Sequence, residues 1–163
     1  MKLIFVFHIL FIVLGSAAFS QQEEAVHWLN FEQLEDSLQT NPKKVFIDFY
    51  ADWCGRCLNM QREVFTDEKI IKILKKEYYA VKMNVESTDT IYFGNEIFIN
   101  ERRNRRNPIH QIPLLMARQK NKTFSLPAIV FMDEKFQAKS RYFQYLNVEQ
   151  LNEILEKSNF ENF

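Results

Sequence analysis

Short apolar runs predict the strands of this chain. Residues 45–50 are apolar on both faces of an extended chain, which is typical of a central strand covered on two sides. Residues 128–132 form a second buried run, and residues 80–85 form a further strand. Residues 26–29 are a shorter candidate, and residues 137–143 are expected to pair back antiparallel after a turn.

Apolar residues at helical spacing predict four helices around these strands. Two of them begin at a capping box, in which Asn30 pairs with Gln33 and Asn147 pairs with Gln150. The other two begin at Cys54 and after residues 66–67. The apolar stripes that define the helices are Phe31, Leu34 and Leu38; Leu58, Met60, Val64 and Phe65; Ile70, Ile71, Ile73 and Leu74; and Leu151, Ile154 and Leu155.

Residues 86–126 form a long connection with elements of its own. Gly94 and Asn95 lie between two short apolar runs, so we predict a β-hairpin with a two-residue turn. A basic tract follows at residues 101–106. After it, residues 107–108 are predicted to cap a helix that runs to Lys120 and is kinked at Pro113.

The order of the elements predicts an α/β domain. It is β α β α α β, then the insertion, then β β α, which indicates a central mixed sheet with helices on both faces. The length of 163 residues suits one domain, and the 47% hydrophobic content supplies a core. Lys+Arg and Asp+Glu balance at 21 each, so net charge does not indicate nucleic acid as a partner. With only 3 Gly and 4 Pro, disorder is not expected.

The first twenty residues are predicted to be a signal peptide. Lys2 is followed by an apolar stretch from Leu3 to Leu14, and small residues end the segment at Ala18 and Ser20. An uncleaved membrane anchor is the alternative, because apolar character continues to Phe19. We therefore expect residues 1–20 to be removed and residues 21–163 to act outside the cytoplasm, for example in a periplasm.

The two cysteines lie in one C-x-x-C motif, Cys54-Gly55-Arg56-Cys57. An exported protein meets oxidising conditions, and these residues are able to form one internal disulfide. A bridge this short closes almost no loop and contributes little stability through chain entropy. Redox chemistry is therefore a better explanation of the motif than a structural role.

The position of each cysteine predicts its part in that chemistry. Cys54 lies at a helix N-terminus, where the helix dipole and free N–H groups favour a thiolate. Cys57 lies one turn further in and is expected to be more buried. We predict that Cys54 is the exposed nucleophile that attacks a substrate disulfide, and that Cys57 resolves the mixed disulfide. Arg56 either lowers the pKa of the Cys54 thiol further or is a solvated side chain with little effect.

Asp48 is an acid in the middle of a predicted buried strand. Burial of an unpaired carboxylate is costly, so its pKa is expected to be raised. We predict that Asp48 accepts the proton of Cys57. The alternative is an acid at a strand edge that reaches water.

Residues 45–57 resemble the active-site strand and loop of the thioredoxin superfamily through the sequence FIDFYADWCGRC. Residues 64–67 and 81–85 make the chain most similar to exported thioredoxin-like proteins related to the C-terminal domain of the thiol:disulfide interchange protein DsbD. The resemblance covers residues 28–155. It implies a thioredoxin fold, with Trp53 as an aromatic flank of the site and Pro127 as a cis-proline facing the disulfide. It also implies that the backbone of Leu126 pairs with an extended substrate segment.

Three departures from the family pattern bear on function. Gly55-Arg56 replaces the Gly-Pro of ordinary thioredoxins, so their redox potential does not transfer. Gln61 stands where the DsbD-like domain has a second acid. Residues 86–126 are longer than the usual connection, and we expect them to help select the partner. The basic tract at Arg102 to Arg106 is either a solvated loop or a contact for an acidic partner.

The sequence thus predicts an extracytoplasmic thiol–disulfide oxidoreductase that reduces protein disulfides. Its only redox group is the Cys54–Cys57 disulfide, with no further cofactor and no metal. We expect a monomer that acts on protein disulfides, does not bind nucleic acid and is served by a membrane electron donor. A thioredoxin-fold chaperone or adaptor is the alternative, and a Cu(I) carrier using the two thiolates is a weaker one.

Overall fold

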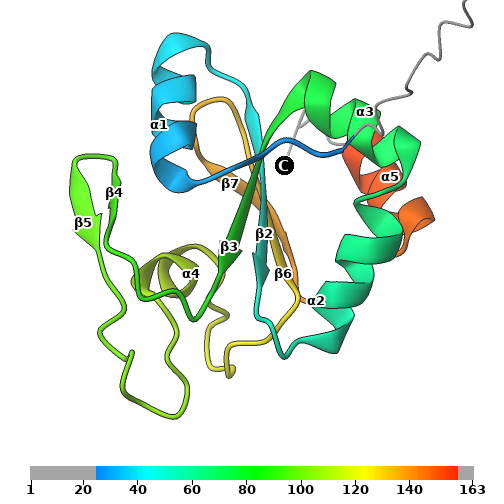
Figure 1. Cartoon of the computed structure of the whole chain (residues 1–163). Helices are drawn as coiled ribbons and strands as arrows, with labels where there is room; N and C mark the ends of the chain where they lie inside the picture. The colour runs from blue at the N-terminus through cyan, green and yellow to red at the C-terminus, as the bar shows by residue number, and fades with distance from the viewer. Residues whose placement is uncertain (1–24, 158–163) are drawn as a thin grey trace, which may run out of the picture.

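The computed structural model describes residues 25–157, and the predicted signal peptide lies outside this range. The chain folds around a five-stranded sheet with the strand order β1-β3-β2-β6-β7 (Figure 1). β3 is parallel to both β1 and β2, whereas β6 is antiparallel to β2 and to β7. The strands of this sheet are β1 (Trp28–Leu29), β2 (Lys44–Tyr50), β3 (Tyr78–Asn84), β6 (Ala128–Met132) and β7 (Ala138–Tyr142).

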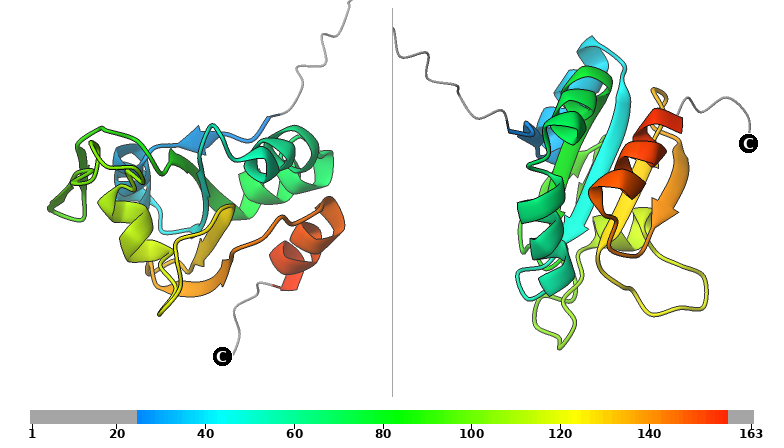
Figure 2. Two further views of the ribbon diagram at one scale, coloured as in Figure 1. Left: turned by 90° about the horizontal axis from the view of Figure 1, so that it is seen from below. Right: turned by 90° about the vertical axis from the view of Figure 1, so that its right-hand side faces the viewer.

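Helices cover both faces of the sheet, as the views in Figure 2 show. The helical segments are α1 (Phe31–Thr40), α2 (Gly55–Asn59), η1 (Met60–Val64), α3 (Glu68–Glu77), α4 (Gln111–Met116) and α5 (Val148–Lys157). The two remaining strands, β4 (Ile91–Phe93) and β5 (Glu96–Phe98), form a separate hairpin. None of the helices within residues 25–157 is long and apolar enough to cross a membrane. The predicted thioredoxin fold, with a mixed sheet and helices on both faces, is confirmed.

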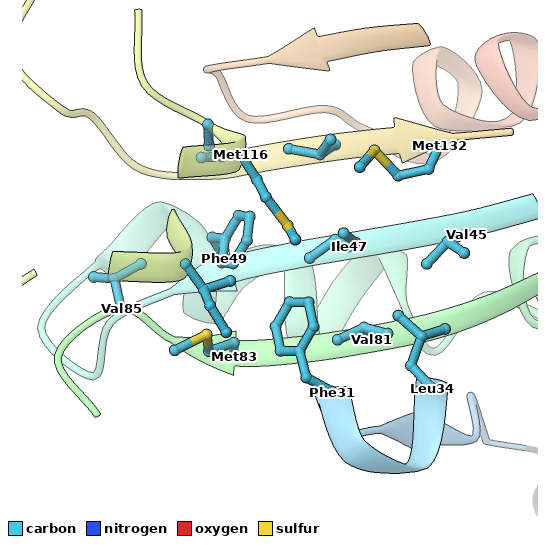
Figure 3. Close-up of a cluster of buried hydrophobic side chains, with 14 of the residues drawn as sticks. Phe31, Leu34, Val45, Ile47, Phe49, Val81, Met83, Val85, Met116 and Met132 are labelled. Atoms are coloured by element: carbon cyan, nitrogen blue, oxygen red, sulfur yellow. The ribbon is translucent and has the colours of Figure 1, made fainter. Parts of the chain in front are cut away.

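The alternation of side chains along β2 divides the core into two clusters. Val45, Ile47 and Phe49 point to the face covered by α1 and α4, where they meet Phe31 and Met116 (Figure 3). Phe46 points to the other face and packs among residues of α3, α5 and the η1 turn. Because both faces of β2 are buried, the strand is apolar at almost every position. Asp48 is the one charged residue that β2 buries in this way.

The predicted helix starts are confirmed for α1, α3 and α5. The Asn30 side chain accepts a hydrogen bond from the backbone N–H of Gln33, and the Gln33 side chain accepts one from Asn30. Asn147 and Gln150 form the same reciprocal pair before α5. These caps depend only on residues three apart in sequence, which explains why the sequence located them.

The helix after Cys54 differs from the prediction. α2 changes at Met60 into a π-helical turn, in which the N–H of Phe65 bonds to the carbonyl of Met60 at 2.9 Å. The extra residue in this turn keeps Met60, Val64 and Phe65 all buried, while Leu58 is only half-buried. The prediction of a regular α-helix that places Leu58, Met60, Val64 and Phe65 on one buried face was therefore wrong.

The predicted start and length of α4 were also wrong. The helix begins after His110 rather than at residues 107–108, and it ends at Met116 rather than Lys120. His110 caps it, because its Nδ1 atom accepts a hydrogen bond from the N–H of Ile112 at 3.2 Å. Pro113 lies in the first turn, where its missing N–H costs nothing, so it does not kink the helix.

The hairpin of β4 and β5 is confirmed, with Gly94 and Asn95 at its turn. Both residues have positive φ, 64° and 62°, as a two-residue turn of this type requires. Helix α1 holds the outer edge of β4, because Glu32 and Glu35 accept hydrogen bonds from the N–H groups of Tyr92 and Gly94. The hairpin is thus attached to the body of the protein along one edge.

Candidate active site

The two cysteines form a disulfide where the loop after β2 enters α2. The Cys54 and Cys57 sulfur atoms are 2.09 Å apart, and the Cα atoms are 5.3 Å apart. Cys54 is the N-cap of α2, and its sulfur accepts a hydrogen bond from the N–H of Cys57 at 3.2 Å. The N–H of Cys54 in turn bonds to the carbonyl of Ala51 at 3.0 Å. This places Cys54 at the first turn of the helix, as the sequence predicted.

Both cysteines are buried in this oxidised state. Cys54 is 6% exposed and Cys57 is 1% exposed. The predicted order of exposure therefore holds, but the expectation of an exposed Cys54 does not. Only a small part of Cys54 therefore faces solvent while the disulfide is formed.

Asp48 lies on β2, on the face of the sheet that α3, α5 and the η1 turn cover. Its neighbour Phe46 points to this face, and side chains two apart on a strand share a face. The carboxyl is 1% exposed, and its Oδ2 atom has no hydrogen-bond partner among the described residues. Burial raises the pKa of Asp48 to about 7, against the opposing effect of the Lys82 ammonium. The alternative prediction, in which Asp48 lies at a strand edge and its carboxyl reaches water, was therefore wrong.

Lys82 is a residue near the site that sequence reasoning missed. It lies opposite Asp48 in the parallel register of β2 and β3. Burial lowers the pKa of Lys82, while Asp48 and Asp52 oppose that shift. Its ammonium group lies 4.7 Å from the ring centroid of Tyr50 and 5.8 Å from that of Trp28, which stabilises the charged form.

The sequence did contain a signal for Lys82, because it is the one charged residue within β3. Lys82 is half-buried, and the buried positions of that strand are apolar, as they are in β2 around Asp48. One interior charge in each of two adjacent apolar strands, Asp48 in β2 and Lys82 in β3, suggests a pair. The register that brings Asp48 and Lys82 together is not visible in either strand alone.

Trp53 lies at the rim of the site, attached to the end of β3. Its side chain is 69% exposed, and its indole N–H donates a hydrogen bond to Glu86 Oε1 at 2.9 Å. Next to it, Asn84 donates from Nδ2 to Asp52 at 3.1 Å. These bonds fix the loop before Cys54 while leaving the ring of Trp53 free to contact another molecule.

Pro127 lies beside the end of β2 that leads to the cysteines. Phe49 pairs with Ala128 in the sheet, so Pro127 adjoins the register position of Tyr50. The peptide bond from Leu126 to Pro127 is cis. Pro127 is buried and Leu126 is half-buried, so the chain just before β6 remains accessible at Leu126.

Arg56 and Gln61 make few contacts. Arg56 is exposed between the two cysteines and has no ion pair with any described residue. The Nε2 atom of the half-buried Gln61 has no hydrogen-bond partner among the described residues. Within residues 25–157, no group of three or more His, Cys, Asp or Glu side chains is arranged to hold a metal.

The amino-acid sequence is similar to a family model and to proteins of known function. A family model described as a thioredoxin-like domain matches residues 31–159. The thiol:disulfide interchange protein DsbD of Campylobacter jejuni is 38% identical over 60 residues, which are 37% of this chain and 10% of that protein. Thioredoxin of Mycoplasmoides gallisepticum is 38% identical over 74 residues, 44% of this chain and 66% of that protein. The chain thus spans about a tenth of the length of the DsbD relative.

Solved structures share the fold. A thioredoxin from Thermus thermophilus superposes with a TM-score of 0.58 at 13% identity, covering 82% of this chain and 86% of that one. The oxidised C-terminal domain of DsbD from Neisseria meningitidis gives a TM-score of 0.52 at 15% identity, covering 78% and 91%.

Proposed function

The chain belongs to the thioredoxin-like domain family, and from this premise we propose that it is an extracytoplasmic thiol–disulfide oxidoreductase that reduces protein disulfides. The observation that carries the proposal is the Cys54–Cys57 disulfide at the start of α2, directly after the strand β2 that buries Asp48. A disulfide that closes so short a loop contributes little as a structural link. At a helix N-terminus, and just after a strand that carries a buried acid, it is suited to exchange.

In the proposed reaction the reduced protein acts through its two thiols in turn. The thiolate of Cys54 attacks one sulfur of the substrate disulfide, which breaks that bond and releases the other sulfur as a thiolate. The thiolate of Cys57 then attacks the sulfur of Cys54 and releases the second substrate thiolate. The substrate has gained two electrons, and the protein is left with the Cys54–Cys57 bond seen here.

Asp48 is proposed to handle the proton in the second step. Cys57 must lose its proton before it attacks, and an acceptor works best when its pKa lies near the working pH. The pKa of about 7 for Asp48 meets this condition, whereas an exposed carboxylate would be too weak a base. Lys82 keeps the pKa of Asp48 from rising further and so retains a share of the ionised form.

The substrate is proposed to bind along the segment before β6. An extended chain would pair with the backbone of Leu126, next to Pro127, and would contact the exposed ring of Trp53. Arg56, exposed between the cysteines, would face the substrate as well. The Cys54–Cys57 disulfide is proposed to be the only redox group, without a bound cofactor or metal.

The location and the electron source are also proposals. A signal peptide at residues 1–20 would send residues 21–163 out of the cytoplasm, into a periplasm or an equivalent space. The protein would act as a monomer. Each turnover leaves the protein oxidised, so a reductant must restore its thiols. Similarity to DsbD suggests a membrane protein as that electron donor.

A trapping experiment tests the proposed mechanism. In Cys57→Ser the second step is blocked, so the substrate should stay bound to Cys54 as a mixed disulfide that survives non-reducing electrophoresis. Mass spectrometry of the adducts from the native host would identify the substrates. The matched control is the double variant Cys54→Ser/Cys57→Ser, which should trap nothing.

The outcome separates the proposed enzyme from a binding protein. Absence of adducts with Cys57→Ser, together with full function of Cys54→Ser in the host, would support a chaperone or adaptor instead. Tight, stoichiometric Cu(I) binding by the reduced protein without any exchange activity would support a metal carrier.

The reduction potential tests the direction of electron flow. For a reductase we expect the potential of the Cys54–Cys57 couple to lie well below about −180 mV, the value for protein disulfide isomerase. Equilibration with glutathione buffers, followed by thiol alkylation, measures it. A potential near about −120 mV, which is typical of a strong oxidant, would overturn the proposed direction.

A further inference from the structure

The loop between β5 and α4 presents four arginines to solvent. Arg102, Arg103, Arg105 and Arg106 are all exposed. None of their guanidinium groups makes an ion pair or a hydrogen bond with the residues that the structure describes. The loop has one acid, Glu101, whose carboxylate accepts a hydrogen bond from Gln111 at 2.9 Å and forms no ion pair with these four arginines. The positive charge of this loop is therefore not neutralised within the described part of the chain.

A buried asparagine holds the loop in shape. Asn100 is only 4% exposed, and its Nδ2 group donates to the carbonyls of Ser87 and Pro108 on either side of the loop. Its Oδ1 atom accepts from the N–H of Arg102 at 3.0 Å. Tight turns follow, with the N–H of Arg105 bonded to the carbonyl of Arg102 at 2.8 Å. These hydrogen bonds hold the backbone that carries the four arginines in one folded conformation.

The segment after β3 that anchors the arginine loop also anchors the loop that carries Trp53. The three residues after β3 bind both structures: Val85 donates its N–H to the carbonyl of Tyr50 at 2.8 Å, Glu86 holds Trp53, and Ser87 holds Asn100. In Figure 1 the arginine loop, the turn between β2 and α2, and the segment leading to β6 all lie at the lower end of the molecule, and the right-hand view of Figure 2 agrees.

Further positive charges lie on the segment that leads to Pro127. Arg118, Lys120 and Lys122 are exposed there. Asp52 and Glu86 are hydrogen-bonded to the uncharged groups of Asn84 and Trp53 and keep their negative charge, but the seven cations outnumber them. The protein as a whole is balanced, with 21 basic and 21 acidic residues, so this concentration of positive charge is local. The cationic rim defined here comprises Arg102, Arg103, Arg105, Arg106, Arg118, Lys120 and Lys122.

We propose that the cationic rim is a docking surface for substrate proteins whose disulfide lies next to an acidic segment. This inference rests on the proposed function and adds the class of substrate. Guanidinium groups bind carboxylates well, but a single exposed ion pair contributes only about 0–1 kcal/mol. Several like charges around one site act together through their field, which increases the rate of encounter with an acidic partner.

A substrate series tests the docking surface. Three peptides carry the same disulfide, flanked by four Glu, four Gln or four Lys residues. At low salt the reduced protein should reduce the Glu-flanked peptide about tenfold faster than the Gln-flanked one, as measured by the second-order rate constant, and the Lys-flanked one slowest. In 0.5 M NaCl the preference should disappear, because the charges are exposed and screened.

Two variants that each remove four positive charges show which surface causes the preference for the Glu-flanked peptide. The rim variant R102S/R103S/R105S/R106S should lose the preference for Glu while keeping its rate on the Gln-flanked peptide. The control K69S/K72S/K76S/K135S removes four exposed lysines away from the site and should keep the preference. A preference that survives in the rim variant, or that falls equally in the control, would overturn the inference. Circular dichroism confirms that both variants are folded.

A binding measurement separates this inference from the proposed function. Fluorescence anisotropy of a labelled, cysteine-free Glu-flanked peptide with the oxidised protein needs no turnover. Binding that the rim variant weakens about tenfold and the control leaves intact supports the docking surface, even if no peptide is reduced. Equal binding by all three proteins contradicts it. Failure to reduce the Gln-flanked peptide contradicts the proposed function alone.

Discussion

Asp48 is a buried acid that forms no salt bridge with any residue in the described range 25–157. The parallel register sets Lys82 beside it, but its Oδ2 atom has no hydrogen-bond partner among the described residues. Desolvation therefore dominates and raises the pKa of Asp48 to about 7. In the unfolded chain the same carboxyl has its ordinary pKa of about 4. This difference links the chemistry of the site to the stability of the protein.

The pKa of Asp48 predicts how stability depends on pH. Between about pH 4 and pH 7 the folded state holds a proton that the unfolded state has lost, so the free energy of unfolding falls as the pH rises through this window. Asp48→Asn removes the effect, because an amide does not ionise. We expect the variant to be more stable than the parent by up to about 4 kcal/mol at pH 8, and by little at pH 4.

Urea unfolding at both pH values, with the disulfide intact, measures this difference. The control Asp36→Asn makes the same chemical change at an exposed position of α1 and should alter stability by less than about 0.5 kcal/mol. A gain from Asp48→Asn that is equal at pH 4 and pH 8 would contradict the assignment of the raised pKa.

At the scale of elements, α4 shows how two local signals compete. An asparagine followed by a proline, as at Asn107 and Pro108, is a common helix start. The helix begins three residues later, because the ring of His110 is buried between α4 and the chain after β3. Burial lowers the pKa of His110, which keeps the ring neutral, so Nδ1 accepts from Ile112 while Nε2 donates to the carbonyl of Asp89.

Asn100 is predicted to be the residue on which the loop between β5 and α4 depends. Asn100→Ala removes the partner of the Ser87 and Pro108 carbonyls and of the Arg102 N–H. Buried groups left without partners cost about 1–3 kcal/mol, so we expect a loss of this size in the free energy of unfolding.

Asn104→Ala is the matched control, because Asn104 is an exposed asparagine of the same loop. It should leave stability unchanged, as measured by urea denaturation. Equal stability of the two variants would show that the hydrogen bonds of Asn100 do not hold the loop. Hydrogen exchange at the amide of Arg102 should also become faster in Asn100→Ala only.

At the scale of the whole molecule, residues 86–126 are not a single appendage. Ile112 and Met116 of α4 are buried in the cluster between α1 and the sheet, so this helix closes the core. Of the hairpin, Ile91 is buried, whereas Tyr92 and Ile97 are exposed. The hairpin and the arginine loop extend beyond the body of the protein (Figure 1). Partner selection is proposed for the cationic rim, which includes the arginine loop, and not for α4.

The sequence by itself determined the strands, the capped helix starts and the position of the C-x-x-C motif. Capping boxes, the Gly94-Asn95 turn and the C-x-x-C spacing act within a few residues, so a local pattern is enough to predict them. The burial of Asp48 followed from an apolar run, because a strand covered on both faces leaves its lone acid no route to water.

Only the tertiary structure decided which distant residues meet. Strand register brings Lys82 beside Asp48, and hydrogen bonds of residues 85–87 join the arginine loop to the loop that carries Trp53. The start of α4 likewise depends on what buries His110. These contacts depend on how segments far apart in the chain pack against one another, and the pattern of a single segment contains no information about its neighbour's register.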